Sequence, residues 1–344
     1  MAGVVALDLS RRGLRGVQVD SAYSARPKLT RFAAVNVPEG TIFDGEIIDQ
    51  RRGTAAIREL WKAGGFTTSK VVLALANRKV VVREVTLPAK VVGAGKAALR
   101  FAVEGQIPID LDDAILDFLP LRAAAQSRDA QEGLLVATAR SSLETTVHAV
   151  EKAGKLVDAI DFGGFGLLRA LPSTPGRTQA IINVGAATTT VVIATGAMPE
   201  FVRMVPSGGD DVTRAIERTL GIGFAEAEQD KTSRGLQGGA ATPRDIEAET
   251  VLRENVASLI DSIRNTLNFY ANAHPDRPIA NIVLTGGGSR LTGLAPVLTR
   301  ALGRPTAHGD PLSTFSVGAK LRGAKLDRWA PELAAALGVT VGEK

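Results

Sequence analysis

The chain has 344 residues, 45% of them hydrophobic and only 4% aromatic, and a formal net charge of +5 at pH 7. It is too long for one ordinary hydrophobic core, so we expect two domains. There is no cysteine and there are only three histidines, which excludes disulfides and thiolate metal sites and disfavours a multi-histidine site. The 41 basic residues are scattered in runs no longer than pairs, which favours a solvated surface over nucleic-acid binding.

The sequence predicts neither a membrane span nor a secretion signal. No apolar stretch reaches the length that crosses a bilayer. Near the N-terminus, Asp8 interrupts the apolar run that a signal peptide needs. We therefore expect a cytoplasmic protein.

The first part of the chain predicts a β meander followed by a helix and a buried strand. The expected strands lie at 4–7, 14–19, 29–37 and 71–76, with a short hairpin or extended link at 42–48. A helix is expected to start at Asp49 or Gln50 and to run through Lys62, because Ile57, Leu60 and Trp61 follow a helical spacing.

A β-α-β-β-α-β pattern follows Asn77, and we interpret residues 78–160 as a small α+β subdomain inserted into the first half. The expected strands are at 80–87, 115–119, 134–139 and 156–160, and the expected helices at 96–105 and 141–154. Residues 126–132 are polar and predict a loop. Ser141 and Ser142 are expected to cap the second helix.

The remaining chain predicts a second domain. A Pro- and Gly-rich linker at 172–176 marks the crossing, so residues 176–315 form domain 2, while 161–175 and 316–344 complete domain 1, which starts with residues 1–77. Helices are expected at 212–220, 224–231, from Thr242 to near His274, at 291–302 and at 329–337, with a strand at 279–284.

Two similar phrases half a chain apart predict a repeated hairpin. VALDLS at 5–10 matches AIINVG at 180–185, so that Asp8 corresponds to Asn183, and a β-branched run follows each phrase. Small residues in the second turn leave backbone N–H groups open to a phosphate. A repeat of this size predicts two related domains that face one another and offer their hairpins to a shared ligand.

Asp8 is the candidate metal ligand. It ends a strand before a hairpin, where a carboxylate can hold a hydrated divalent cation beside phosphates. A turn-capping role explains the same position equally well. Gly185 and Thr188 would contact the ligand from the facing hairpin, whereas Asn183 is neutral and adds no charge for a cation.

Three further segments predict ligand contacts, each with a structural alternative. The Gly-Gly pair at 208–209 opens a helix and could bind an anion, although an N-cap by Asp210 explains it equally well. Glu228 and Lys231 share a helix face and could contact a ribose or adenine, or form a surface ion pair. The three glycines at 286–288 could support a flat ligand or serve as a strand-to-helix turn.

The order of these features resembles the actin-like ATPase superfamily. Several phrases are similar to the PilM family of type IV pilus assembly, and the resemblance covers nearly the whole chain. These phrases are VPEGTIFDGEIID, REVTLP, FAVEGQIP, PSGGDDVTRAI, AEAEQDK, IVLTGGGSRLTGL and APELAAALGV. The cell-division protein FtsA is a more distant relative.

The resemblance implies an α/β, actin-like ATPase fold, with two related domains around a nucleotide cleft and a small inserted α+β subdomain in the first half. It implies that ATP or ADP binds there with Mg²⁺, which Asp8 would hold. The nucleotide-binding residues implied are Asp8, Ser10, Arg11, Asn183, Gly185, Ala186, Thr188, Gly208, Gly209, Glu228, Lys231, Gly286, Gly287, Gly288 and Arg290. Asn183 replaces the usual acid, so we expect slow or negligible hydrolysis, at most a weak ATPase.

The resemblance also implies partners. A groove between the first domain and the insert would take the N-terminal cytoplasmic tail of a PilN-like membrane protein, alongside other pilus platform proteins. The protein would then lie at the inner-membrane face through its partners, without binding nucleic acid; a homo-oligomer stays open. Leu87, Pro88, Phe101 and Ile107 could line the groove, or form the core of the insert.

Two other functions compete with a pilus scaffold. An ATP-dependent phosphotransferase of the sugar-kinase kind would use Asp210 or Asp211, but nothing in the insert predicts a sugar site. An FtsA-like division protein would end in a linker and an amphipathic membrane helix, whereas this chain stops at residues 342–344, directly after its last expected helix. We therefore favour the pilus scaffold.

Overall fold

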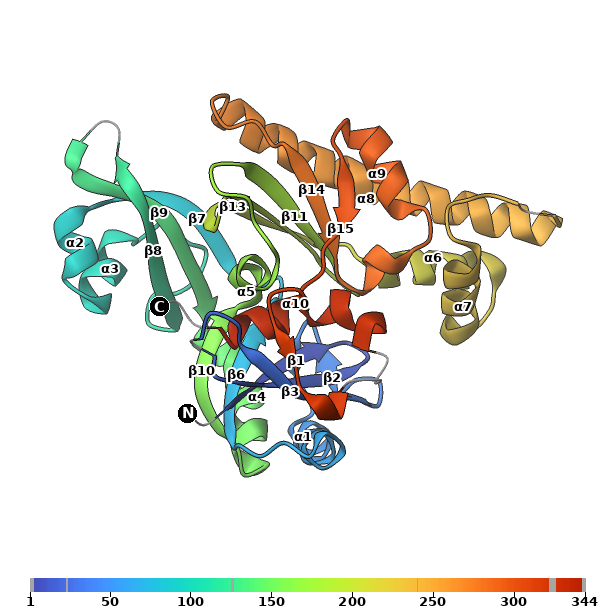
Figure 1. The fold of residues 1–344 in the computed structure, drawn as a ribbon, viewed down its shortest axis with the longest axis horizontal. Helices are drawn as coiled ribbons and strands as arrows, with labels where there is room; N and C mark the ends of the chain where they lie inside the picture. Colours follow the sequence, from blue (N-terminus) through green and yellow to red (C-terminus); the bar gives the residue numbers. More distant parts are fainter. Residues whose placement is uncertain (1–2, 23, 125–126, 240, 322–325, 342–344) are drawn as a thin grey trace.

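Two sheets that each begin with an antiparallel hairpin form the two halves of the molecule (Figure 1). The computed structural model describes residues 3–22, 24–124, 127–239, 241–321 and 326–341. Gln126, where the expected loop began, and residues 342–344, on which the comparison with FtsA-like chains depended, lie outside the described residues. In the described part of the chain, no helix is both long and apolar enough to cross a membrane.

The first sheet has six strands in the order β10-β6-β1-β2-β3-β16. They are β1 (Val4–Ser10), β2 (Gly13–Asp20), β3 (Lys28–Asn36), β6 (Lys70–Leu75), β10 (Leu156–Phe162) and β16 (Ser316–Val317). Alternate residues of β1 enter two cores: Val5 and Leu7 pack under helices α1 (Gln50–Gly64) and α4 (Arg140–Lys152), and Ala6 packs toward α10 (Ala330–Val339). This sheet and its helices are called the first domain below.

The second sheet has five strands in the order β13-β12-β11-β14-β15. They are β11 (Thr178–Val184), β12 (Thr189–Thr195), β13 (Met198–Val205), β14 (Asn281–Thr285) and β15 (Thr306–His308). One face packs against α6 (Gly209–Leu220), α8 (Pro243–Ala273) and α9 (Leu294–Leu302), and α7 (Phe224–Arg234) lies beside α6. This second domain and the first are separated by α5 (Gly163–Ala170) and α10, which lie between the sheets (Figure 1).

Between β6 and α4 the chain forms a separate three-stranded sheet with the order β7-β9-β8. It consists of β7 (Val81–Pro88), β8 (Ala114–Ala124) and β9 (Ser127–Ala139), with α2 (Ala89–Gly93) and α3 (Lys96–Ala102) on one face. These elements are called the insert, and they project to one side of the molecule (Figure 1). The short elements elsewhere are β4 (Ile42–Phe43), β5 (Glu46–Ile47), η1 (Gly287–Arg290), η2 (Ala319–Leu321) and η3 (Leu326–Arg328).

The sequence-based boundary of the insert at residue 160 is wrong, because the last predicted strand of the insert belongs to the sheet of the first domain. Strand β10 pairs in parallel with β6, and α4 packs against α1, so residues 140–162 belong to the first domain. The reason is topological: β10 completes a parallel pair whose partner lies far back in the sequence. A contiguous β-α-β-β-α-β pattern cannot reveal this partner.

Two local predictions in the insert also differ from the structure. The polar segment expected as a loop continues β9, where Glu132 pairs with Thr86 and Gln131 with Leu87, because the hairpin extends beyond the insert's core. Helix α4 begins at Arg140, and the hydroxyls of Ser141 and Ser142 donate to Asp113 and to the Ala139 carbonyl instead of accepting from the helix.

Candidate functional site

A cavity of about 660 Å³ lies between the β1–β2 hairpin of the first domain and the β11–β12 hairpin of the second. Its volume is within the range of small-molecule sites, roughly 300–1,000 Å³. All fifteen positions that the sequence assigned to a nucleotide line this one cavity. Six charged residues that were not assigned line it too: Arg12, Arg15, Asp44, Asp210, Arg328 and Glu332.

The second hairpin meets the cavity with backbone atoms. Its turn is closed by the Gly185 N–H, which donates to the Thr188 carbonyl at 2.9 Å. Helix α6 packs directly on this turn: the Gly209 N–H donates to the Gly185 carbonyl at 2.9 Å and the Asp210 N–H to the Ala186 carbonyl at 2.8 Å. A side chain at 208 would meet the Ala186 carbonyl oxygen at 2.5 Å, so glycine is required there.

The start of α6 is therefore not an open anion site. Its first N–H groups are used by the second hairpin, and the Gly208 N–H donates to the Asp211 carboxylate at 2.9 Å. The side chain that caps α6 is thus that of Asp211, and the sequence-based alternative of a cap by Asp210 is wrong. Among the described hydrogen bonds, none is donated by the N–H groups of Ala186 and Ala187, so these turn N–H groups are the donors that remain for a ligand.

The glycines at 286–288 have separable roles. Gly286 has φ +87°, and a side chain there would meet the Val184 carbonyl oxygen at 2.4 Å. A side chain at 288 would meet a methyl group of Val184 at 2.4 Å. Gly287 is the most open of the three, since its nearest neighbour would be Glu332 at 3.4 Å. The outer glycines let η1 pack on the end of β11, and the middle one leaves space in the cavity.

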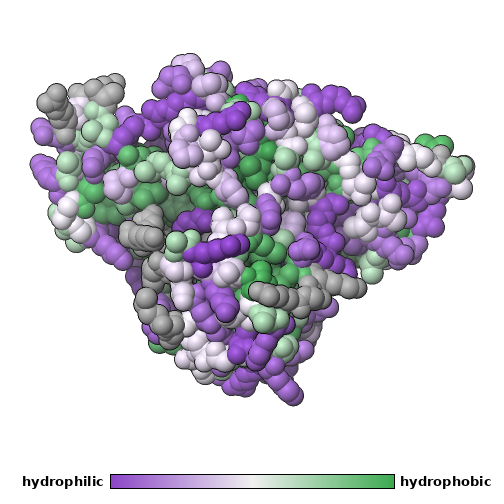
Figure 2. All heavy atoms as spheres, viewed as in Figure 1, coloured by the Kyte–Doolittle hydropathy of each residue, from purple (hydrophilic) through white to green (hydrophobic). Residues whose placement is uncertain are grey.

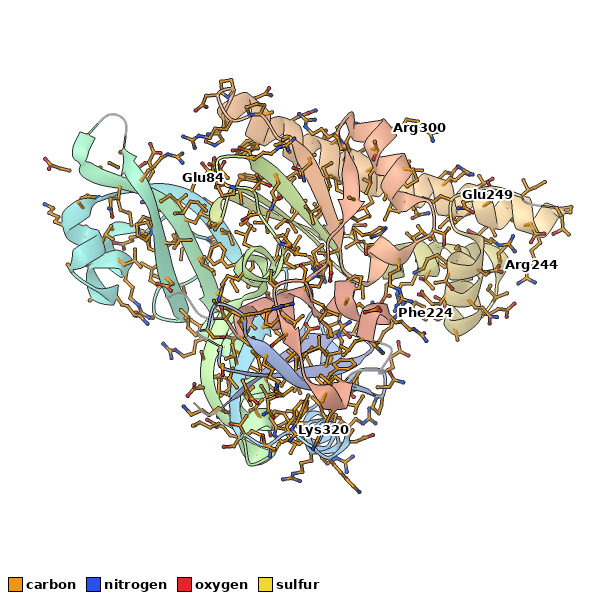
Figure 3. The ribbon with its side chains drawn as sticks, viewed as in Figure 1. Glu84, Phe224, Arg244, Glu249, Arg300 and Lys320 are labelled. Carbon is orange, nitrogen blue, oxygen red and sulfur yellow. The ribbon has the colours of Figure 1, made fainter. Side chains whose placement is uncertain are left out.

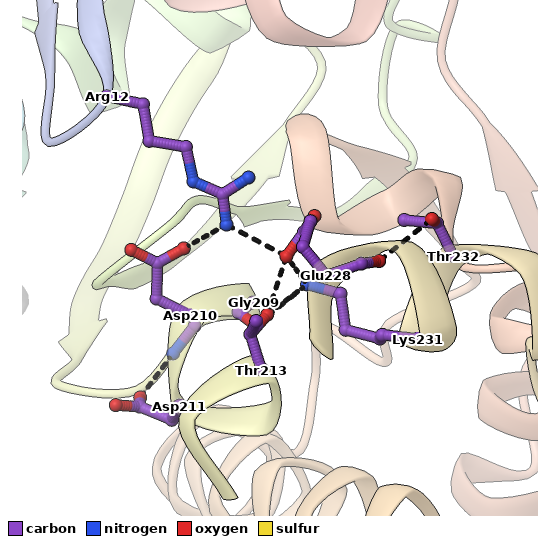
Figure 4. Close-up of polar contacts among 9 residues, drawn as sticks. Arg12, Gly209, Asp210, Asp211, Thr213, Glu228, Lys231 and Thr232 are labelled. Atoms are coloured by element: carbon purple, nitrogen blue, oxygen red, sulfur yellow. Dashed lines mark hydrogen bonds and ion pairs between the residues drawn. The ribbon is translucent and has the colours of Figure 1, made fainter. Parts of the chain in front are cut away.

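Arg12, at the tip of the first hairpin, bridges the two domains (Figure 4). Its Nη2 lies 2.5 Å from Asp210 Oδ1 on α6 and 2.9 Å from Glu228 Oε2 on α7. The guanidinium lies over the ring of Phe224, 5.1 Å from its centroid. Phe224 itself lies between α7 and the first domain (Figure 3). Asp210 is 2% exposed, so this bridge compensates a buried carboxylate.

Glu228 and Lys231 complete this Arg12 cluster (Arg12, Asp210, Thr213, Glu228, Lys231). The Lys231 ammonium donates to the Gly209 carbonyl at 2.9 Å and to Glu228 Oε2 at 2.8 Å. Burial raises the pKa of Glu228, but hydrogen bonds from Arg12 and Lys231 outweigh burial and lower the pKa from 4.5 to about 2. Burial lowers the pKa of Lys231, and its contact with Glu228 opposes this effect. The expected surface ion pair is therefore part of an interdomain network.

A second network forms the Asp8 cluster (Asp8, Arg15, Arg290, Glu332). Arg15 Nε donates to Asp8 Oδ2 at 2.9 Å, and its Nη1 lies 2.5 Å from Glu332 Oε2 at the start of α10. Arg290 of η1 lies 3.2 Å from the other oxygen of Glu332. Both Asp8 and Arg15 are 16% exposed. The chain of charges thus connects the first hairpin, α10 and the second domain.

The predicted magnesium site at Asp8 does not fit this geometry. Five carboxylates line the cavity, and each already has a basic partner. The pairs are Asp8–Arg15, Asp44–Arg78, Asp210–Arg12, Glu228–Lys231 and Glu332–Arg15. Within the described ranges, no cluster of three or more His, Cys, Asp or Glu could hold a metal ion. The equivalent position of the second hairpin is the neutral Asn183.

Neither carboxylate nominated for phosphotransfer is available as a base. Asp210 accepts from Arg12 and is buried, and Asp211 caps α6. Ser10 is also engaged locally, because its hydroxyl donates to the Gly13 carbonyl at 3.1 Å across the hairpin turn. The two nominated carboxylates and the Ser10 hydroxyl are thus engaged with other groups of the described chain.

One missed pair was accessible from the sequence. In the β1–β2 hairpin Ser10 pairs with Gly13, which places Asp8 directly opposite Arg15. Opposite charges at facing positions of antiparallel strands attract one another, so this contact follows from the register once the turn is placed. Arg12 contacts two residues that are separated from it by 198 and 216 positions in the sequence. No local pattern predicts such contacts.

The predicted partner-binding residues do not form one surface. Leu87 and Ile107 are 2% and 8% exposed and pack with Leu99 and Val103 in the insert's own core, so their assignment to a groove is wrong. Phe101 is 82% exposed and Pro88 is also exposed. The alternative of an internal core, which the sequence left open, holds for the first two residues.

Two facing domains with a shared hairpin and a cavity between them define a protein of the actin-like ATPase fold, as expected. The family model described as "Type IV pilus assembly protein PilM" matches residues 6–343, and the chain belongs to this family.

Solved structures agree with this assignment. A PilM–PilN type IV pilus biogenesis complex is similar with a TM-score of 0.85 and 25% identity over 99% of both chains. MreB5 of Spiroplasma citri bound to AMPPNP shares the fold alone, with a TM-score of 0.56 and 12% identity over 99% of this chain and 96% of that one.

The curated relatives are more distant. The cell-division protein FtsA of Borreliella burgdorferi is 25% identical over 207 residues, or 54% of this chain and 49% of the relative. FtsA of Escherichia coli K12 is 24% identical over 192 residues, 48% of this chain and 46% of the relative. The chain thus spans about half the length of the curated relatives it matches.

Proposed function

We propose that this chain is a nucleotide-binding scaffold of type IV pilus assembly, which binds ATP or ADP between its two domains and hydrolyses ATP slowly or not at all. The observation that carries the proposal is that all fifteen positions assigned to the nucleotide line one cavity of about 660 Å³. A fold relative, MreB5 of Spiroplasma citri, has been solved with AMPPNP and with ADP. Both carboxylates nominated for phosphotransfer are engaged with other groups, which supports slow turnover.

The cavity offers different chemistry along its length. The N–H groups of Ala186 and Ala187 can donate to phosphate oxygens from the second hairpin. Glu228 is held ionised by Arg12 and Lys231, and its Oε1 has no described hydrogen bond, so it can accept from ribose hydroxyls. Gly287 leaves space in which a base can lie against the backbone.

We propose that the same protein binds the N-terminal tail of a PilN-like membrane protein, as the solved PilM–PilN complex suggests. The apolar face of the insert that is turned away from α2 and α3 supports this. Its half-buried residues Ile115, Leu119 and Leu121 pack against a core that also contains Leu167, Leu168 and Val202 of the other domains. Strand β8 is an edge strand, so an extended peptide can pair with it.

Figure 2 shows hydrophobic side chains gathered where the insert meets the rest of the molecule. This face is an alternative to the four residues that the sequence nominated, of which Leu87 and Ile107 are buried in the core of the insert. A tail bound there would hold the protein at the inner-membrane face through its partner.

Calorimetric titration with ATP and with ADP tests the nucleotide site. Ala186→Glu places a carboxylate at the tip of the second hairpin, where phosphates are expected, and we predict an affinity loss of about tenfold or more. The control Ala55→Glu adds the same charge on the exposed face of α1 and should bind as the parent does. Binding unchanged in Ala186→Glu, or fast phosphate release by the parent protein, would contradict the proposal.

A labelled peptide from the tail of a PilN-like protein tests the docking face. Leu121→Asp should weaken peptide binding by about tenfold or more, because it charges an apolar contact surface. Phe101→Asp is the matched control on the opposite face of the insert and should leave binding unchanged. Thermal melts of both variants check that the insert stays folded. Equal loss in both variants would remove β8 from the docking face.

A further inference from the structure

The acidic and basic side chains of the cavity differ in whether they have ion-pair partners. Six basic and five acidic side chains line it. All five carboxylates are paired with basic groups, as described above. By contrast, Arg11 and Arg328 line the cavity without an ion pair to any described residue. Two basic groups of the cavity therefore have no described partner charge, whereas each carboxylate has one.

The ion pair of Asp8 decides whether this carboxylate is available to a divalent cation. Arg15 lies directly opposite it in the hairpin and donates to it at 2.9 Å. The other side of the guanidinium is held by Glu332, so Arg15 is fixed between two carboxylates at 16% exposure. Mg²⁺ is usually bound through one or two carboxylates together with phosphates. Here the carboxylate's charge is compensated, and Asn183 supplies no second one.

The geometry of the arginines suits phosphate. A guanidinium offers several donors in one plane and can contact two phosphate oxygens at once. Arg11 reaches the cavity from the first hairpin, and Arg290 reaches it from η1 with one described bond, to Glu332 at 3.2 Å. These groups supply, from the protein itself, the positive charge that the sequence had assigned to a metal.

We propose that this protein binds its nucleotide as the free phosphate anion, without a divalent cation, and that Arg15 supplies beside Asp8 the charge that a metal would otherwise bring. The inference rests on the proposed nucleotide site and specifies its ligand as metal-free ATP or ADP. Excess Mg²⁺, which complexes ATP in solution, then competes with the protein for the free nucleotide.

The test is a pair of calorimetric titrations with ATP, one in EDTA and one in excess MgCl₂. We expect the apparent affinity for ATP to be higher in EDTA than in MgCl₂, and equal affinities would overturn the inference. An increase of about tenfold or more on adding MgCl₂ would overturn this inference and leave the nucleotide site intact. Binding in neither condition would overturn the nucleotide site, and this inference with it. The two failures are thus distinguishable.

Two variants separate a metal ligand from an arginine-compensated carboxylate. Asp8→Asn keeps an oxygen that accepts from Arg15, so its affinity for ATP should stay within about threefold of the parent in both conditions. If Asp8 held a metal, this variant would lose its affinity in MgCl₂ and the inference would fail.

Arg15→Gln removes the ion pairs that Arg15 forms with Asp8 and Glu332. We expect it to weaken binding in EDTA by about tenfold and to bind ATP more tightly when MgCl₂ is added, whereas the parent should bind more weakly. The control is Arg264→Gln, which breaks a surface pair with Asp261 on α8 and should match the parent in both conditions. Should Arg15→Gln fail to fold, Asp8→Asn decides the question alone.

Discussion

The two hairpins that face the cavity have the same strand arrangement but opposite chemistry. The tip of the first carries Arg11 and Arg12, and the guanidinium of Arg12 reaches α6 and α7 of the other domain. The tip of the second consists of Ala186 and Ala187, and it receives α6 on its carbonyl groups. One hairpin therefore contributes charge through long side chains, while the other contributes backbone in close contact.

This difference shows how two copies of one structural unit can contribute different groups to the same cavity. The shared strand pairing places both turns at the same cavity, whereas the residues in each turn decide what they offer. Close backbone packing tolerates no added atoms, so changes around the second hairpin should act sterically and strongly. Ion pairs at a half-exposed tip can exchange partners, so changes in the first hairpin should act electrostatically and more weakly.

The largest effect is expected from Gly286→Ala, beside the second hairpin. A methyl group would meet the Val184 carbonyl at 2.4 Å in a backbone conformation with φ +87°. We expect the free energy of unfolding to fall by about 3 kcal/mol. Gly287→Ala is the control, since its nearest contact would be 3.4 Å, and it should lose less than about 1 kcal/mol. Urea unfolding measures both; equal losses would contradict the steric account.

The pH dependence of stability tests whether Arg12, at the tip of the first hairpin, stabilises the ionised carboxylate of Glu228. The pKa of Glu228 falls from 4.5 to about 2 on folding, so its stabilisation is present above pH 4.5 and disappears as the pH drops toward 2. With 25% exposure, we expect the loss to be about 2 kcal/mol. Glu228→Gln should remove this part of the pH dependence. A variant with the same acid profile as the parent would show that Arg12 and Lys231 do not stabilise the carboxylate.

Arg12→Ala should cost about 1 kcal/mol, because it leaves the buried Asp210 without its partner but removes a half-exposed side chain. In an Asp210→Asn background the same change should cost less, and a double-mutant cycle from chemical denaturation gives the coupling. Arg218→Ala, on the exposed last turn of α6, is the control and should be neutral. Additive losses would mean that the Arg12–Asp210 contact does not join the domains in solution.

The smallest effect on folding is expected from Arg11→Gln. No described residue pairs with Arg11, so stability should change by less than about 0.5 kcal/mol. Affinity for ATP should nonetheless fall about threefold, and the difference from the parent should shrink as salt is added. Titrations at low and high ionic strength measure this. An effect that is independent of salt would argue against an electrostatic role for the first hairpin.

The lining of the cavity was implied by the family resemblance, and the strand ends and glycines that carry this resemblance are local signals. Asp8 and Asn183 lie near the ends of apolar strands and the glycines at 286–288 follow one, and the sheets bring these ends together. The partners of the charges were not predictable in the same way. The Arg15–Glu332 contact joins residues 317 positions apart, and it depends on where α10 packs.

The insert was predicted less well, for two physical reasons. Leu87 and Ile107 carry no local mark that separates a groove from a core, since both surfaces are apolar. Residues 127–132 extend a hairpin beyond its core, so polarity alone suggested a loop where strand pairing continues. Sheet membership of β10 required knowledge of β6, which a contiguous pattern does not contain.

Helix α10 also bears on how the chain folds during synthesis. Leu333 and Leu337 cover one face of the first sheet, beside Ala6 and Val17, across more than 300 residues of sequence. At a synthesis rate of roughly 5–20 residues per second, that face stays without its covering helix for tens of seconds. The core between the second sheet and α6, α8 and α9 lies entirely between Ala180 and Leu302, so we expect this part of the second domain to fold first on the ribosome. Proteolysis of stalled chains ending after β15 should yield a protected fragment from the second domain, while the first domain remains an apolar surface for chaperones.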